Sequence, residues 1–529
     1  MTDWHEDTIA AISTAPAPSG IGIVRMSGPD AFEVADRIFR RSRKSASDPA
    51  YHEKYLSAQK ANTVHHGYIC DGSDIIDEVL AVLFHAPHSY TGEDTVEFDC
   101  HGGMLTTRKI LELAVHRGAR LAEPGEFSRR AFLNGRMDLS QAEAVMDVIS
   151  AQNDRALHSA ERQLEGSLSE EIHNIRQTLL HETARIEAAL DDPEHLSLDG
   201  YAPVITKIIN TQKKKIERLI DSAASGRFIR EGLKTVITGK PNAGKSSLLN
   251  YMLGRDKAIV TEIAGTTRDI LEETVNMRGI TLRLLDTAGI READDTIEKI
   301  GVERAAKQVQ DADLVLYVVD SSVNLDDNDR KILSMIRGRQ VIVILNKSDL
   351  ESVVTEEDLR EFLRKNAAEN KTVAENSDVK NAVAENSDVK NAVAENSDEK
   401  NAEVYKNSDN VAMSGYSDSM DRDMYPIIQM SSKNRTGMEE LEKQIERMFF
   451  SGKIGQDDQV CITNERHRAV LEDADQSLSL VLNSIEDGMP EDFWSIDLMG
   501  ACDALGKITG ETAGEDLVNE IFSSFCMGK

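Results

Sequence analysis

The chain has 529 residues with 92 acidic and 61 basic side chains, which gives a formal net charge of −31. This length predicts several domains, and the acidic balance makes the chain a poor match to a polyanion such as RNA unless its basic residues cluster. Its five cysteines show no paired metal-ligand spacing, and the sequence shows no signal peptide or apolar run of membrane-spanning length. We therefore expect a cytoplasmic protein, in a reducing compartment, with no membrane partner.

The N-terminal segment mixes short β-type runs with helical patterns. Strands are predicted at residues 22–26, 79–84 and 95–99, and helices at residues 31–40 and 105–117. This mixture predicts an α+β domain over residues 1–128.

The following segment changes to a helical pattern. Asp138 and Gln141 have the spacing of a capping pair at the start of its first helix, and apolar periodicity then continues from residue 151 to 189. Helical patterning returns near the end of the chain. We therefore predict a helical domain built from two segments, residues 129–229 and 451–529.

Between these helical segments, residues 230–450 alternate strands with helices. Apolar runs at residues 314–320, 341–345 and 426–430 have the continuous hydrophobic character of buried strands. This alternation predicts an inserted α/β domain with a parallel sheet that helices cover on both faces.

The inserted domain begins with a phosphate-binding loop. Residues 239–246 read Gly-Lys-Pro-Asn-Ala-Gly-Lys-Ser and lie between a strand predicted at residues 233–238 and a helix at residues 245–253. Such a loop turns its backbone N–H groups toward nucleotide phosphates. Lys245 would neutralise the β- and γ-phosphates, and the Ser246 hydroxyl would bind Mg²⁺. The expected nucleotide contacts here are Asn242, Ala243, Gly244, Lys245, Ser246 and Ser247.

A second phosphate motif closes the apolar run at residues 280–285. Its carboxylate at a strand end and its glycine N–H are the groups that Mg²⁺ and a γ-phosphate need. The motif consists of Asp286, Thr287, Ala288 and Gly289.

Two later loops have the residues that read a guanine base. The carboxylate of Asp349 can accept hydrogen bonds from N1 and N2 of guanine, a pair of donors that adenine lacks, so an ATPase would leave Asp349 without a purpose. The first loop, after the run at residues 341–345, is Asn346, Lys347, Ser348 and Asp349, and the second is Ser431, Ser432 and Lys433.

The ordered series resembles the translation-factor-related GTPases with a Ras-like fold. The resemblance implies a switch segment between the two phosphate motifs, with Thr267 as the second protein ligand to Mg²⁺ beside Ser246. The segment expected to contact the nucleotide is Thr261, Glu262, Ile263, Ala264, Gly265, Thr266 and Thr267.

Residue 290 is isoleucine, whereas Ras-like enzymes place at this point a glutamine that orients the attacking water. Another group must therefore position water. Glu298 is our candidate general base, and the residues alone leave Glu292, Asp294 and Asp295 open as alternatives.

Three further motifs lie outside the inserted domain. They are residues 124–136 (Pro-Gly-Glu-Phe-Ser-Arg-Arg-Ala-Phe-Leu-Asn-Gly-Arg), Thr-Gly-Glu-Asp at residues 91–94 with His-Gly-Gly at 101–103, and Phe-Cys-Met-Gly-Lys at 525–529. With these motifs the chain resembles the MnmE (TrmE) family of tRNA modification GTPases over nearly its whole length. The resemblance implies an N-terminal folate-binding domain, a helical domain and an inserted GTPase domain.

The same resemblance implies that K⁺ and dimerisation of the GTPase domains offset the missing glutamine. The K⁺ ligands would be Asn242, Thr261, Ile263 and Thr266, although loop stabilisation explains Asn242 equally well from its residue type. It also places the catalytic glutamate at Glu298.

For the N-terminal domain the resemblance implies a tetrahydrofolate derivative as one-carbon donor. Arg25, Glu97, Arg136 and Lys529 would contact the folate, and Cys526 would be the reactive thiol. Each charged residue could otherwise be an ordinary surface charge, and Cys526 a bystander.

The implied product is a 5-carboxymethylaminomethyl or aminomethyl group on the wobble uridine of certain tRNAs. The implied partner is a flavin-dependent protein of the glucose-inhibited division protein A family, which would form a heterotetramer with a homodimer of this chain and make most of the tRNA contact. A different class remains open: a switch-type ribosome-assembly GTPase without folate chemistry, which would not need Arg25, Glu97 or Cys526.

One segment departs from the family. The ten residues 373–382 recur nearly unchanged at 383–392 and 393–402, and within residues 351–425 acidic side chains outnumber basic ones by 18 to 9. A polar period of this kind fits neither a helical nor a strand face. We predict that residues 366–424 form a solvated loop that leaves the guanine-binding ends intact.

Overall fold

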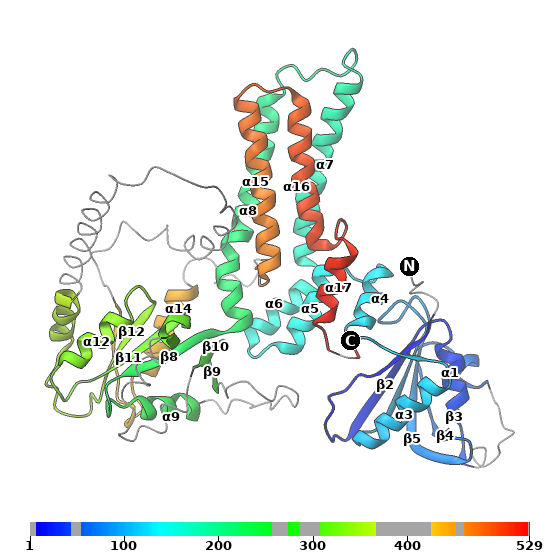
Figure 1. Ribbon diagram of the computed structural model, residues 1–529, viewed down its shortest axis with the longest axis horizontal. Helices are drawn as coiled ribbons and strands as arrows, with labels where there is room; N and C mark the ends of the chain where they lie inside the picture. The colour runs from blue at the N-terminus through cyan, green and yellow to red at the C-terminus, as the bar shows by residue number, and fades with distance from the viewer. Residues whose placement is uncertain are drawn as a thin grey trace, which may run out of the picture. The chain divides into compact units, whose positions relative to one another are not determined.

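The computed structural model describes residues 7–43, 54–255, 273–285, 307–366, 425–450, 460–526 and 528–529 (Figure 1). The chain forms two compact units. One comprises Met1–Arg230, Glu262–Thr267 and Gln456–Lys529, and the other comprises Glu231–Thr261 and Arg268–Gly455. Nearly all of the predicted repeat insertion lies outside the described residues.

The first unit begins with a seven-stranded sheet in the order β3-β4-β5-β6-β2-β1-β7. Neighbouring strands are antiparallel except β1 and β7, which are parallel. The strands are β1 (Ile9–Ile12), β2 (Ile21–Ser27), β3 (Phe39–Arg40), β4 (Thr63–Asp71), β5 (Asp74–Phe84), β6 (Thr95–His101) and β7 (Arg120–Leu121).

Helices α1 (Ala31–Ile38) and α3 (Met104–His116) pack their apolar residues against this sheet, and the short η1 (Leu56–Ala58) and α4 (Glu126–Leu133) complete the α+β domain. The three predicted strands and both predicted helices are confirmed in position and type. Helix α1 ends two residues earlier than predicted, because Phe39 takes an extended conformation and pairs with Ile69 in β4.

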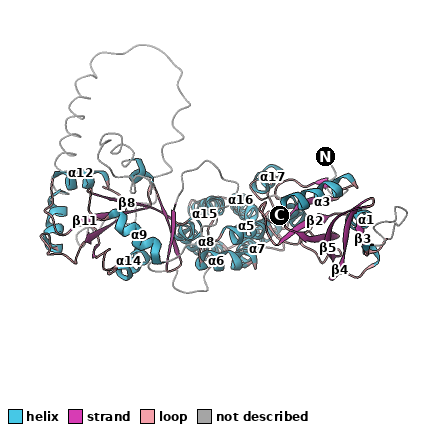
Figure 2. Ribbon diagram, turned by 90° about the horizontal axis from the view of Figure 1, so that it is seen from below, coloured by secondary structure: helices cyan, strands magenta, loops and turns pink. Residues whose placement is uncertain are grey.

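The rest of the first unit is helical, as predicted. The helices are α5 (Leu139–Ser150), α6 (Asp154–Leu164), α7 (Ser167–Asp191), α8 (Ala202–Glu231), α15 (Glu465–Glu486), α16 (Glu491–Thr509) and α17 (Glu515–Ser523). Helices α7, α8, α15 and α16 lie side by side in Figure 1 and are seen nearly end-on in Figure 2. Among the described helices, none combines the length and the apolar character that crossing a bilayer demands.

Two local predictions for these helices have different outcomes. The capping pair is confirmed, since the Asp138 carboxylate accepts from the N–H of Gln141 at 2.9 Å and the Gln141 side chain accepts from the N–H of Asp138 at 3.0 Å. The apolar periodicity from residue 151 to 189 is divided between two helices. Gly166, with φ of 95°, breaks it between α6 and α7.

A buried ion cluster joins α5 to α15. The Glu143 carboxylate lies 2.7 Å from Nε2 of His467 and 2.8 Å from Nη2 of Arg466. Burial alone would raise the pKa of Glu143, but His467 and Arg466 outweigh it and lower that pKa to about 2.

We expect this cluster to make the helical bundle sensitive to acid. Because the folded pKa of Glu143 lies below its ordinary value of 4.5, its contribution is present above about pH 4.5 and is lost as the pH falls toward about 2, a loss of roughly 3 kcal/mol. Urea unfolding followed by the fluorescence of the buried Trp494 should show this loss, and Glu143→Gln should abolish it. The control Glu465→Gln changes an exposed carboxylate in the first turn of α15 and should keep the acid dependence.

The second unit contains a six-stranded sheet in the order β13-β12-β11-β8-β10-β9. Its elements are β8 (Leu233–Gly239), α9 (Lys245–Arg255), β9 (Glu273–Met277), β10 (Ile280–Leu284), β11 (Leu314–Asp320), α12 (Asp327–Met335), β12 (Val341–Asn346), β13 (Ile427–Gln429) and α14 (Met438–Phe450). Every residue of β11 and β12 is buried, so both faces of the sheet are covered, as predicted.

The sheet is parallel, as predicted, except at one edge. β9 pairs antiparallel with β10, whereas the other neighbours are parallel. The connection is a two-residue turn at Arg278 and Gly279, whose φ angles of 51° and 76° suit the tight hairpins that join antiparallel strands.

Candidate functional site

The phosphate-type loop lies between β8 and α9, where the sequence places it. The φ angles of Asn242 and Gly244 are 62° and 101°. A Cβ on Gly239 would lie 2.3 Å from the carbonyl oxygen of Val318, and one on Gly244 would lie 2.1 Å from Nδ2 of Asn346. Gly239 is therefore required by the close approach of the β11 backbone and Gly244 by the side chain of Asn346, and these contacts fix the loop against the sheet.

Lys245 begins α9 and folds back over this loop. Its ammonium donates to the carbonyl oxygens of Gly239 at 2.9 Å and Lys240 at 2.8 Å, and burial lowers its pKa. Ser246 and Ser247 follow in the first turn of the helix and are exposed. A cation, backbone N–H groups and hydroxyls thus gather at a helix N-terminus, which is suited to bind a phosphate chain.

Asn346, at the end of β12, connects this loop to the other two predicted loops. Its Nδ2 donates to the carbonyl oxygen of Ala243 at 2.9 Å. Its Oδ1 accepts from the backbone N–H of Ser432 at 3.1 Å and from the Ser432 hydroxyl at 3.0 Å. Three segments far apart in the sequence therefore meet at one buried amide.

Asp349 lies exposed beside this junction. It accepts a hydrogen bond of 2.5 Å from the Ser431 hydroxyl, and this bond is the main reason why the pKa of Asp349 is lowered. The N–H of Ser348 donates to the carbonyl oxygen of Met430 at 3.1 Å, and Lys347 pairs with Asp320 at 2.5 Å. The carboxylate is thus charged and held at the surface, where it can accept from a planar base.

Several predicted site residues lie outside the described residues. They are Thr261 to Thr267, Asp286 to Gly289, Glu298 and its alternatives Glu292, Asp294 and Asp295. Asn242 and Lys433 are described, and both side chains are exposed.

The first unit brings together Arg25, Glu97 and Lys529 of the predicted folate contacts. Arg25 on β2 faces Glu97 on β6, and its Nε lies 2.6 Å from the carboxylate. The guanidinium carbon lies 5.4 Å from the ring centroid of Tyr90 and 5.6 Å from that of Phe127. A cation and a carboxylate beside a partly exposed aromatic ring, Tyr90, can bind a planar heterocycle with an acidic tail.

The C-terminal segment reaches the same place. The carbonyl oxygen of Gly528 accepts from Arg25 at 3.4 Å and from the Ser13 hydroxyl at 3.2 Å. The ammonium of Lys529 lies 6.0 Å from the Tyr90 ring centroid, and burial, followed by the charge of Arg25, lowers the pKa of Lys529. Gly528 has φ of 87°, and a Cβ there would lie 2.4 Å from the carbonyl oxygen of Ile12.

The other two predicted residues of this site, Arg136 and Cys526, are both exposed. Arg136 is exposed after α4, and among the described residues no hydrogen bond or ion pair joins its side chain to Arg25, Glu97 or Lys529. The side chain of Cys526 is an exposed free thiol. The backbone carbonyl oxygen of the same residue accepts from the N–H of Gly125 at 3.4 Å.

Sequence reasoning missed the aromatic residues that flank Arg25. Tyr90 directly precedes the Thr-Gly-Glu-Asp motif, and Phe127 lies inside the motif at residues 124–136. The position of both residues in or next to a motif was therefore a usable signal, but nothing in the residue types showed that both rings would reach the same guanidinium.

Known proteins resemble this chain along its whole length. The tRNA modification GTPase MnmE of Lachnoclostridium phytofermentans is 46% identical over 523 residues, which cover 99% of each chain. The chain belongs to the MnmE family. The MnmE of Clostridioides difficile is 42% identical, again with 99% of each chain covered.

Two family models divide the MnmE-type chain. The N-terminus of the GTP-binding protein TrmE matches residues 8–136, and the MnmE helical domain matches residues 139–526. Among solved structures, Aquifex aeolicus Era bound to GDP·AlF4− is 21% identical over 47% of this chain and 67% of its own, and the G domain of the T. maritima FeoB iron transporter is 22% identical over 40% and 96%. Both have a TM-score of 0.23.

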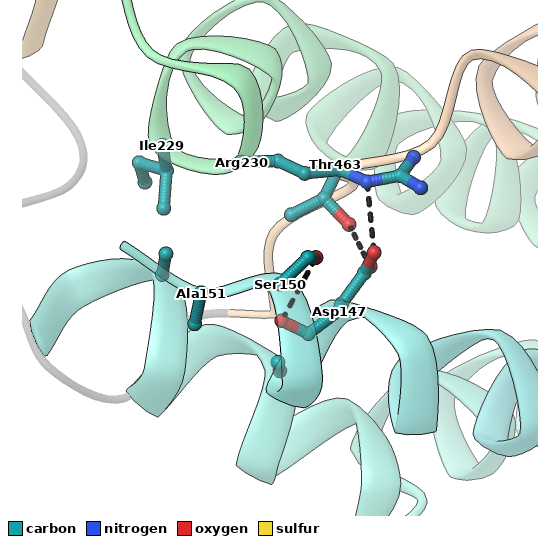
Figure 3. A pocket seen from close by; sticks show the side chains of 8 residues that line it. Asp147, Ser150, Ala151, Ile229, Arg230 and Thr463 are labelled. Carbon is teal, nitrogen blue, oxygen red and sulfur yellow. Dashed lines mark hydrogen bonds and ion pairs between the residues drawn. The ribbon is translucent and has the colours of Figure 1, made fainter. Parts of the chain in front are cut away.

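This MnmE family member also has a small buried pocket in the helical part of the first unit (Figure 3). Asp147 on α5 points toward Arg230 and Thr463, with its carboxylate 2.8 Å from Nε of Arg230 and 3.5 Å from the Thr463 hydroxyl. Burial raises the pKa of Asp147. Arg230 is the last residue before the chain enters the second unit, and Thr463 follows its return, so one carboxylate contacts both connections.

Proposed function

We propose that the chain is a K⁺-dependent GTP hydrolase that, with a flavin-dependent partner of the glucose-inhibited division protein A family, modifies the wobble uridine of certain tRNAs in the cytoplasm. The product would carry a 5-carboxymethylaminomethyl or aminomethyl group, and a tetrahydrofolate derivative would supply the one-carbon unit. The observation that carries the GTPase part is the Asn346 junction, which joins the phosphate-type loop to the two loops beside Asp349.

The residues around this junction fit a guanine nucleotide with Mg²⁺. Lys245 donates to backbone carbonyls of its own loop, and a phosphate chain would replace these acceptors with charged oxygens. Ser246 offers a hydroxyl at the N-terminus of α9, and Thr267 would offer the second. Mg²⁺ would neutralise charge on the β- and γ-phosphates. Asp349 would accept from N1 and N2 of guanine.

Hydrolysis in this proposal depends on Glu298 and on K⁺. Ile290 cannot orient water, so Glu298 would hold the attacking water as general base. The oxygens of Asn242, Thr261, Ile263 and Thr266 suit a hard monovalent cation, which would stabilise the charge that other GTPases leave to an arginine. Dimerisation of the GTPase domains would complete this site.

The Arg25 site fits the folate. The partly exposed Tyr90 provides an aromatic ring beside the half-buried pair of Arg25 and Glu97, and Lys529 adds a second cation. Arg136 would contact the folate from the exposed end of α4, and Cys526 would act as the reactive thiol beside it. The residues of this chain would bind and orient the folate, and the partner would make most of the contact with tRNA, consistent with a net charge of −31.

The proposal divides the chain into four segments. Residues 1–128 would bind folate, residues 129–229 and 451–529 would form the helical domain, and residues 230–450 would be the GTPase domain. The family models change at a similar point near residue 136, which supports the first division.

The deciding experiment is analysis of wobble uridines in cells that lack this chain, with hydrolysis measured in K⁺ and then in Na⁺. We expect the modification to disappear and hydrolysis to be faster in K⁺. Normal wobble uridines, no folate binding and no preference for K⁺ would instead support a switch-type ribosome-assembly GTPase.

We expect Arg25→Lys to weaken folate binding by about tenfold while GTP hydrolysis is unchanged. Lysine keeps the positive charge opposite Glu97, but it loses the planar group that contacts the rings of Tyr90 and Phe127. Calorimetry with a stable reduced folate measures the change. Arg108→Lys, on the exposed face of α3, is the control and should bind as the wild type does.

A further inference from the structure

The α15–α16 hairpin is rich in acidic residues, of which Glu472 pairs with Arg468 at 2.9 Å and Asp475 with Lys213 at 2.5 Å. From residue 469 to residue 506 the chain has nine acidic residues and no lysine or arginine. The acidic residues are Glu472, Asp473, Asp475, Glu486, Asp487, Glu491, Asp492, Asp497 and Asp503. A segment of this length with one sign of charge attracts cations and repels anions.

The same hairpin exposes large apolar side chains. On α16, Phe493 is 46% exposed and Ile496 is 67% exposed, and Met499 continues this face one turn later. The opposite face of α16 carries the buried Trp494 and Leu498, which pack in the core of the bundle. Because α16 already buries one apolar face in the core, the exposed apolar residues on its outer face are not needed for packing within the bundle.

Helix α15 extends this face. A Cβ on Gly500 of α16 would lie 3.5 Å from the Ser477 hydroxyl of α15, which fixes how the two antiparallel helices face each other. One turn beyond that contact, Leu480 on α15, 47% exposed, comes level with Ile496 on α16. Figure 1 shows the two helices side by side and joined at one end. Leu480, Phe493, Ile496 and Met499 thus form one apolar strip, which we call the hairpin strip.

The charges around the hairpin strip decide what can cover it. A second copy that pairs through the same surface would bring two acidic hairpins together, which costs free energy. The repeat insertion is acidic as well, and RNA is a polyanion. A cationic surface with apolar anchors remains, and an amphipathic helix supplies both from one element.

We propose that the hairpin strip is a docking surface for a basic amphipathic helix of a protein partner. The apolar side of that helix would cover Ile496 and Phe493, and its lysines and arginines would lie beside the carboxylates of the hairpin. This site uses no residue of the GTP or folate sites, so it stands whether or not the proposed function holds.

The test uses the full chain and a synthetic Leu/Lys amphipathic helix of about 18 residues, long enough for five turns. Fluorescence anisotropy of the labelled peptide measures affinity. We expect Ile496→Ser and Phe493→Ser each to weaken binding about tenfold, and a rise from about 50 mM to about 300 mM salt to weaken it further. Leu105→Ser is the matched control, since Leu105 is also 67% exposed but lies on α3.

Three results would overturn the proposal: equal binding of a Leu/Glu peptide of the same pattern, equal loss of binding in Leu105→Ser, or self-association of the chain that Ile496→Ser abolishes. The last would assign the strip to a second copy. Because Ile496 and Phe493 are exposed, the variants should keep the wild-type thermal unfolding, and Asp492→Asn gives a second, milder test of the charge.

Discussion

Asp349→Asn should lower the affinity for GTP by roughly 100- to 1,000-fold and shift preference toward xanthosine triphosphate. The wild-type carboxylate would accept from both N1 and N2 of guanine. An asparagine can accept from N1 but presents an amide N–H₂ toward N2, so one hydrogen bond becomes a clash of donors. Xanthine has a carbonyl oxygen at that position, and the amide can donate to it.

Titration with fluorescent guanine and xanthine nucleotides measures this change. Asp358→Asn is a matched control in the same unit, because Asp358 is also exposed and also accepts a hydroxyl hydrogen bond, of 2.6 Å from Thr355. It should leave both affinities unchanged. An Asp349→Asn protein that still prefers GTP would remove Asp349 from base recognition.

Glu298→Ala should keep GTP affinity and lower the hydrolysis rate by about 100- to 10,000-fold, the range that one general base contributes. The methyl group cannot hold the attacking water, and Ile290 offers no substitute. Single-turnover hydrolysis in K⁺ separates this chemical step from nucleotide binding.

The alternatives provide the controls for that experiment. Glu292→Ala, Asp294→Ala and Asp295→Ala remove the other carboxylates of the same acidic stretch and should hydrolyse GTP at close to the wild-type rate. If one of them loses turnover instead, the general base is that residue.

Local patterns predicted much of the fold. The strand, loop and helix around residues 239–246 and the capping pair Asp138 and Gln141 follow from short-range chemistry, and both lie where the sequence indicated. The break at Gly166 was missed because apolar periodicity continues on either side of it, and only the backbone conformation marks the end of α6. The edge strand β9 was missed because its pairing depends on the turn at Arg278 and Gly279.

For the candidate sites too, the sequence predicted which residues take part but not which groups they contact. The sequence named Asn346 from its motif, and the family resemblance named Arg25 and Glu97; the structure shows what each touches. The contacts of Arg25 with Tyr90 and Phe127 could not be predicted, since they depend on three segments that only the tertiary fold brings together.

The Asn346 junction bears on how the chain would distinguish GTP from GDP. Its amide ties the floor of the phosphate loop to the base pocket through Ala243 and Ser432, and neither contact would reach a third phosphate. These two contacts would therefore contribute nearly the same amount to the affinity for GTP as to the affinity for GDP. The distinction between GTP and GDP would instead depend on residues 261–267 and 286–289, so substitutions there should alter the rate of the GTPase cycle. Substitution of Asn346 should weaken the binding of both nucleotides.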